Sequence, residues 1–248
     1  MDRDFRQGHL EIDFPTEPFH SAFRLLLHSA VLFFANLRFL AAVTLVVYLP
    51  GKLALQFVLY LLHVPTSGMV SYLALDLSDL VLGALAIPAA IYGLVAKFRS
   101  GKVASVRESL RWGRRQWGKT LWNMFKVEIT VALWGALLVI PGLVAMVRLI
   151  FADVIVAIEA DRETEVLARS RILTKGHGWR IFLVVLPLMV AGLMGSFLVL
   201  GALEEAAYSR VVMAVADSVL SVGGQFTTVA VLLMYLGVAR PAAPATAP

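Results

Sequence analysis

The sequence predicts an all-α, polytopic membrane protein: a helical bundle of six transmembrane helices with interfacial amphipathic helices beside them. Composition, six long apolar stretches and the placement of basic residues lead to this prediction. Of the 248 residues, 59% are hydrophobic and only 16% are charged, and the mean hydropathy is +0.80. Soluble domains are about 45–50% apolar and about 25% charged. A soluble fold of this size could not cover so much apolar surface with polar groups, which excludes a soluble globule and a disordered chain.

Six apolar stretches are long enough for a transmembrane helix, which needs about 20 residues to cross a hydrocarbon core of about 30 Å. They lie near residues 37–60, 70–96, 120–140, 143–160, 180–203 and 210–238. Pro141-Gly142 alone separates the third from the fourth and predicts a tight hairpin turn. The first span has an alternative register near 31–49, with 53–75 along the membrane surface. Lys52 favours this alternative, and the continuous apolar run to Leu62 favours 37–60.

Basic residues predict the orientation of these spans. The 97–119 connection holds eight Lys or Arg residues against one acid, Glu108, and the 161–180 connection holds five. Residues 62–70 and the Pro141-Gly142 turn hold none, and 204–210 holds only Arg210. Because positive charge stays in the cytoplasm, we expect both basic connections and both termini there, and the turns at 62–70, 141–142 and 204–209 outside.

The expected organisation has three parts. Residues 1–36 form a cytoplasmic segment with an amphipathic helix, 37–238 form the six-span domain, and 239–248 form a Pro/Ala-rich cytoplasmic tail. Residues 1–20 carry five acidic residues and no apolar stretch, so they do not read as a signal peptide.

An amphipathic helical pattern precedes each odd-numbered span. Apolar residues recur at spacings of three, four and seven within 19–30, 103–110 and 166–173, and basic residues lie opposite. A serine and a later basic residue also recur: Ser29 and Arg38, Ser109 and Lys119, and Ser170 and Arg180. The chain is therefore either three repeated units, each an interfacial helix followed by a transmembrane hairpin, or a plain bundle. The basic faces rest on anionic lipid headgroups or a partner, or the helices cover the bundle's cytoplasmic end. The residues predicted for a lipid or partner surface are Arg107, Arg111, Arg114, Arg115, Arg169 and Lys175.

Ionisable residues inside spans are costly and mark candidate functional positions. The candidates are Lys52, Asp79, Lys126, Glu128, Arg148, Asp153 and Asp217, with Asp76 nearby. Depth along each predicted helix matches Arg148 with Asp217 and Lys126 with Asp153, at about 1.5 Å per residue. Lys52 can pair with Asp79, whereas Glu128 has no depth-matched cation. The charges are either structural pairs or a polar path for protons, ions or a lipid headgroup.

Catalytic and metal-binding patterns are absent from the sequence. It contains no cysteine, its five histidines are scattered, and no GxSxG elbow, P-loop or Asp-rich transferase pattern occurs. We therefore expect no enzyme activity, no metal and no cofactor. The net charge of +5 is expected to reflect topology and not nucleic-acid binding.

Residues 97–185 resemble a known family. The basic, Ser-containing stretch KFRSGKVASVRESLRWG precedes a span that ends in LLVIPGLVAMVRLIFADVIVAIE, and the helix EVLARSRILTKGHGWRIF follows. This order resembles the YciC-like inner-membrane proteins and the membrane domain attached to some bacterial glycerophosphodiester phosphodiesterases. In these families a Pro-Gly hairpin is similarly followed by an acidic turn and an Arg-Ser-x-x-Leu-Thr helix.

The resemblance implies a six-helix protein of the bacterial inner membrane without an assigned activity. In the fused proteins catalysis resides in a separate soluble barrel, for which we expect no room here. We therefore expect a non-catalytic accessory or scaffold in envelope or transport physiology. Its expected partners are the lipid bilayer, anionic lipid headgroups and a membrane or cytoplasmic protein. The alternative is a small carrier or lipid-handling transporter that uses the intramembrane charges.

Overall fold

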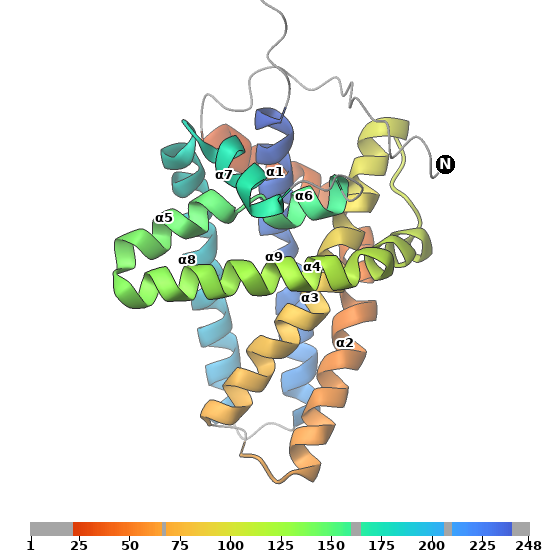
Figure 1. Cartoon of the computed structure of the whole chain (residues 1–248). Helices are drawn as coiled ribbons and strands as arrows, with labels where there is room; N and C mark the ends of the chain where they lie inside the picture. The colour runs from red at the N-terminus through yellow and green to blue at the C-terminus, as the bar shows by residue number, and fades with distance from the viewer. Residues whose placement is uncertain (1–21, 66–67, 160–164, 206–209, 240–248) are drawn as a thin grey trace, which may run out of the picture.

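The computed structural model describes residues 22–65, 68–159, 165–205 and 210–239, and every regular element in these ranges is an α-helix. Within these ranges, four long helices run lengthwise through the molecule (Figure 1): α2 (Leu37–Leu61), α3 (Met69–Ser100), α8 (Gly178–Glu205) and α9 (Arg210–Val238). The described residues contain five segments that are long and apolar enough to cross a membrane, namely these four and Val139–Ile158. The prediction of an all-α membrane bundle is confirmed, and six spans are not.

The two ends of the bundle differ in charge. The end at the top of Figure 1 carries α1 (Ala22–Ala35), α7 (Val166–Thr174) and the connection after α3, with basic residues such as Lys97, Lys102 and Lys175. We call this the basic end. The 62–65 turn lies at the opposite end, where α8 stops and α9 starts, and we call it the loop end. The two basic connections thus share one end, as predicted. Arg162 and residues 206–209, to which parts of that prediction refer, lie outside the described residues.

The first span has the register 37–60 and not 31–49. α2 continues through Pro50 to Leu61, and the Lys52 side chain is completely buried. The alternative register is wrong because carboxylates inside the bundle bind Lys52, so this lysine does not need the membrane surface. The spans predicted at 70–96, 180–203 and 210–238 correspond to α3, α8 and α9.

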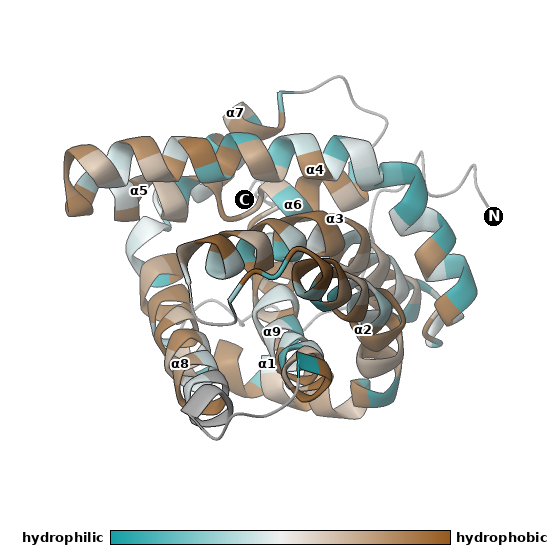
Figure 2. Ribbon diagram, turned by 90° about the horizontal axis from the view of Figure 1, so that it is seen from below, coloured by the Kyte–Doolittle hydropathy of each residue, from teal (hydrophilic) through white to brown (hydrophobic). Residues whose placement is uncertain are grey.

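The third and fourth predicted spans form a different structure. α4 (Val106–Leu137) runs without a break through the second predicted amphipathic segment and the third predicted span. The fourth predicted span is divided into α5 (Val139–Leu149) and α6 (Ala152–Ile158). α4 and α5 form a hairpin that runs across the long helices (Figure 1) and is hydrophobic at its tip (Figure 2). The expected pair of transmembrane helices at 120–140 and 143–160 is therefore not confirmed, although Val139–Ile158 is long and apolar enough to cross a membrane.

The turn of this hairpin lies at Leu138 and not at Pro141-Gly142. Leu138 is extended, with φ −159° and ψ 140°, and α5 begins directly after it. Pro141 fits in the first turn of α5 because a backbone N–H there has no helical acceptor. A Cβ atom at Gly142 would lie 2.7 Å from the Cα atom of Gly135 in α4. Gly142 therefore allows the two helices to pack closely, which is a different role from the predicted one.

A side chain of α7 forms hydrogen bonds with backbone groups at the junction between α5 and α6. The Ser170 hydroxyl donates to the Arg148 carbonyl at 2.8 Å and accepts from the Phe151 N–H at 3.3 Å. The Thr174 hydroxyl lies 3.0 Å from the Ser170 carbonyl. A helix break leaves backbone groups without helical partners, and a buried one must find another. Ser170 and Thr174, the serine and threonine of the sequence Arg-Ser-x-x-Leu-Thr, therefore have a structural role: their hydroxyl groups form hydrogen bonds with backbone groups of α5 and α7.

The main buried core lies toward the basic end. It includes Leu40 of α2, Leu94 of α3, Ile181 of α8 and Leu232 of α9. Phe151, directly before α6, is completely buried in the same cluster. α6 is thus part of the core, although the sequence predicted it to be the end of a span.

The three predicted repeats are not confirmed. α1 and α7 each precede a pair of long helices, whereas the middle amphipathic segment is the first part of α4. Ser29, Ser109 and Ser170 are all completely buried. Their contacts differ, because Ser29 bonds to the Leu25 carbonyl of its own helix and Ser170 bonds across to α5. The alternative of a plain bundle therefore stays open.

Candidate functional site

Lys52 is the centre of a charge cluster inside the bundle. Its Nζ atom lies 2.6 Å from Oδ1 of Asp79 and 2.7 Å from Oδ2 of Asp217. α2, α3 and α9 each contribute one residue, so the cluster joins three of the long helices. The Lys52 side chain is completely buried, whereas Asp217 is 16% and Asp79 is 46% exposed. The predicted pair of Lys52 and Asp79 is present, and Asp217 is an additional partner.

The predicted pair of Arg148 and Asp217 is wrong. Asp217 binds Lys52, and Arg148 belongs to α5, where its side chain is exposed. Lys126 likewise does not pair with Asp153 and lies over the Trp122 ring, 5.3 Å from its centroid. Both predictions counted depth along helices assumed to be parallel. Because the α4–α5 hairpin runs across the bundle, equal counts along α5 and α9 do not mean equal depth.

Polar side chains continue from this cluster along the contact between α2 and α9. Buried polar residues recur at every fourth position of α2 and therefore share one face: Thr44, Tyr48, Lys52 and Gln56. At the loop end, the Arg210 guanidinium donates to Oε1 of Gln56 at 3.3 Å and to the Val64 carbonyl. These polar side chains thus form a continuous row from the loop end to the middle of the bundle.

Asp76, Glu128 and Asp153 form a second group of charges, on α3, α4 and α6. Glu128 lies close enough to the other two carboxylates for their charges to repel. Glu128 and Asp153 also line a hollow of about 120 Å³. Glu128 makes no ion pair with a cation of the described residues. Among those residues, no group of three His, Cys, Asp or Glu side chains is placed to hold a metal ion.

The first part of α4 presents basic residues outward. Arg107, Arg111, Arg114 and Arg115 are all exposed, which is compatible with the predicted lipid or partner surface. Arg169 is only partly exposed, at 32% of its side chain. Its Nε atom lies 3.7 Å from Oε1 of Glu159, so part of its guanidinium belongs to an ion pair within the protein.

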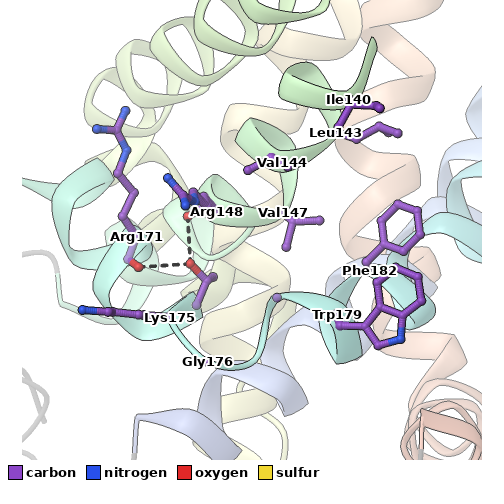
Figure 3. Close-up of a pocket in the computed structure, with 12 residues that line it drawn as sticks. Ile140, Leu143, Val144, Val147, Arg148, Arg171, Lys175, Gly176, Trp179 and Phe182 are labelled. Atoms are coloured by element: carbon purple, nitrogen blue, oxygen red, sulfur yellow. Dashed lines mark hydrogen bonds between the residues drawn. The ribbon is translucent and has the colours of Figure 1, made fainter. Parts of the chain in front are cut away.

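A pocket of about 740 Å³ lies between α5, α7 and the start of α8. One wall consists of Ile140, Leu143 and Val144 of α5, and another of Trp179 and Phe182 of α8. The cations at its edge are Arg148, Arg171 and Lys175, all exposed. Figure 3 shows these cations on one side of the pocket, with the Arg171 and Lys175 side chains extending away from it, and the two aromatic rings on the other. The pocket therefore has an apolar interior, with positive charge beside it.

Sequence reasoning found only part of this pocket. Arg148 and Lys175 were candidates, but for a charge pair and for a surface, while Arg171 and Trp179 were missed. The pocket exists because α5 turns back across the bundle toward α7 and α8, which no local pattern predicts. Trp179 was the available signal, because tryptophan next to basic residues at the start of an apolar stretch is typical of the membrane–water interface.

No protein-family profile, curated protein or solved structure matches this sequence. The resemblance of residues 97–185 to the YciC-like proteins stays a prediction.

Proposed function

We propose that this chain is a non-catalytic membrane protein that binds an anionic lipid in the pocket between α5, α7 and α8. The observation that carries the proposal is the composition of that pocket. Apolar side chains of α5 and α8 form its walls, and Arg148, Arg171 and Lys175 lie together at one side. An anionic lipid offers the matching chemistry, because its phosphate needs cations and its acyl chains need an apolar surface.

The size and position of the pocket support this assignment. Ligand pockets measure about 300–1,000 Å³, and this one measures about 740 Å³. It lies toward the basic end, where the predicted topology places the anionic cytoplasmic leaflet. Each basic residue near such a leaflet contributes about 1 kcal/mol of attraction. Trp179, exposed beside the pocket, is suited to the headgroup level.

Lipid binding is compatible with the accessory or scaffold role expected from the sequence. A bound lipid that stays in place would join the hairpin to α7 and α8. A lipid that exchanges would instead support the lipid-handling alternative. The two roles share the same binding step, which can therefore be tested first.

Native mass spectrometry of the purified full chain tests this step. The protein is mixed with phosphatidylglycerol or with phosphatidylcholine, and retained lipid is counted. We expect retention of phosphatidylglycerol and its loss in the double variant Arg171→Gln/Lys175→Gln. The matched control is Arg107→Gln/Arg114→Gln, which removes the same charge from exposed positions of α4 outside the pocket. Val144→Trp, which fills the pocket without changing charge, should also lose the lipid.

Equal loss in the control variant would contradict the proposal, because it would indicate a diffuse attraction of the basic end. Displacement of the lipid by inorganic phosphate alone would also contradict it, because the site would then recognise a free anion. Retention of phosphatidylcholine as strong as that of phosphatidylglycerol would remove the role assigned to the cations.

A small carrier is the second candidate function. The observation that favours it is the hollow between Glu128 and Asp153, beside Asp76. Carboxylates within the membrane-spanning part of a protein are typical of proton and ion paths. Proton uptake into proteoliposomes, lost in Glu128→Gln and retained in Arg107→Gln, would support this candidate. The absence of any flux would exclude a proton carrier.

A further inference from the structure

A two-residue turn at Ile150 and Phe151 divides the fourth predicted span into α5 and α6. α5 has 11 residues, which corresponds to about 16 Å at the α-helical rise, or about half of a hydrocarbon core. Ile150 and Phe151 form a turn that keeps right-handed helical backbone angles, and α6 packs into the core. Val139–Ile158 as a whole is long and apolar enough to cross a membrane, so the direction of the hairpin decides whether it does.

The contacts of α4 with α3 determine this direction. α4 contacts α3 at Gly113, where an added Cβ would collide with the Leu85 carbonyl oxygen and lie 3.1 Å from the Cβ of Ala89. The Trp117 indole donates to the Val81 carbonyl of α3 at 3.0 Å. Beyond this contact no residue from 121 to 137 is fully buried. The hairpin leaves the bundle sideways, and its tip does not point toward the loop end (Figure 1).

The surface of the hairpin changes along its length. The first half of α4 has an exposed basic face, formed by Arg107, Arg111, Arg114 and Arg115. The tip has large apolar side chains that are half exposed or more: Leu133, Trp134, Leu137, Leu138, Val139 and Ile140. Ile140, for example, is 74% exposed. Water could not cover this surface without a large hydrophobic penalty.

We propose that the α4–α5 hairpin does not cross the membrane and inserts its apolar tip among the acyl chains of the leaflet at the basic end. The basic first half of α4 then lies at the headgroups of that leaflet, as in interfacial helices. α5 contacts α8, whose outer surface is also apolar, with Leu183, Met189 and Leu193 exposed. Acyl chains that cover α8 in a membrane would therefore cover the hairpin tip as well. The chain crosses the bilayer through α2, α3, α8 and α9, and the turn at Leu138 stays on the side where the hairpin began.

This topology keeps both basic connections on one side of the membrane. A hairpin that crosses twice and one that does not cross have the same effect on every later segment. The charge asymmetry that predicted six spans is therefore equally compatible with four. The two topologies differ at the tip of the hairpin, which was predicted to lie outside together with residues 62–70.

Single-cysteine variants separate the two topologies, because the chain contains no cysteine. Gly135→Cys marks the tip and Gly68→Cys marks the loop end, and at both positions a Cβ would have no neighbour within 4 Å. Lys102→Cys marks the basic end. Each variant is reconstituted and treated with a membrane-impermeant maleimide from either side. A fluorophore attached at position 135 is then quenched by lipids that carry a doxyl group high or low on the acyl chain.

We expect loss of labelling at position 135 from both sides and strong quenching by the doxyl group nearer the headgroup. Labelling of position 135 from the side that labels position 68 would overturn the proposal in favour of a span. Labelling from the side of position 102 without quenching would place the tip in water and also overturn it. Weak quenching together with a disulfide between two copies would overturn the proposal, because a second copy of the chain and not lipid would then cover the tip. Val139→Cys repeats the measurement if Gly135→Cys does not fold.

Discussion

Replacing Lys52 by methionine should destabilise the bundle more than any other single change in its charge cluster. Methionine has a similar length but no charge, so Asp79 and Asp217 lose their shared ammonium group. Removing one partner of a buried ion pair costs about 3–5 kcal/mol, because the remaining charge is left uncompensated. Lys52 is completely buried and binds two carboxylates. We therefore expect the upper part of this range, about 5 kcal/mol.

The two aspartates should differ from each other. Asp217 is 16% exposed, so Asp217→Asn should cost about 3 kcal/mol, the lower part of the range for buried pairs. Asp79 is 46% exposed, so Asp79→Asn should cost about 1 kcal/mol or less, as for surface pairs. The triple variant with all three substitutions contains no uncompensated charge. It should recover much of the stability that Lys52→Met loses, since buried pairs can often be replaced by uncharged groups at little cost.

Equilibrium unfolding in mixed micelles measures these differences. Unfolding by increasing sodium dodecyl sulfate is followed by helical circular dichroism, and the free energy of unfolding is obtained by linear extrapolation. The expected order of destabilisation is Lys52→Met, then Asp217→Asn, then Asp79→Asn. A Lys52→Met variant no less stable than Asp79→Asn would refute the reasoning. A triple variant as unstable as Lys52→Met would also refute it, because the three charges would then act independently.

Further predictions concern the hairpin and the helix ends. Gly142→Val should separate α4 from α5 and lower the free energy of unfolding by about 1–3 kcal/mol, the usual cost of overpacking, in the same assay. Ser170→Ala should cost about 1–3 kcal/mol because it leaves buried backbone groups unbonded, whereas Ser29→Ala, whose hydroxyl bonds within its own helix, should cost less. Hydrogen bonds from the Ser105 side chain and backbone lower the pKa of Glu108 below its ordinary value, so its stabilisation of the α4 start is complete above that ordinary value. It should be lost as the pH falls through the lowered pKa, seen as faster amide exchange in the first turn. Glu108→Gln, which retains a capping box, should abolish this pH dependence.

The long helices of the bundle could be predicted from the sequence to within a few residues. Bilayer thickness sets the length of an apolar helix, and apolar length is a local property of the chain. Lys52 and Asp79 could also be paired from sequence, because α2 and α3 are joined by a short turn and therefore pack side by side. The basic connections were correctly grouped at one end because positive charge gathers on one side of a membrane, and two crossings or none between them give the same result.

The direction of the hairpin and the partners of its charges could be decided only by the tertiary structure. Residues 120–140 have the composition of a span, but contacts at Gly113 and Gly142, together with the break that Ser170 binds, turn α4 and α5 across the bundle. Arg148 consequently lies at the pocket, and Asp217 forms its ion pair with Lys52 instead. These outcomes depend on which distant segments meet, and composition along one helix contains no information about the neighbour that the helix will contact.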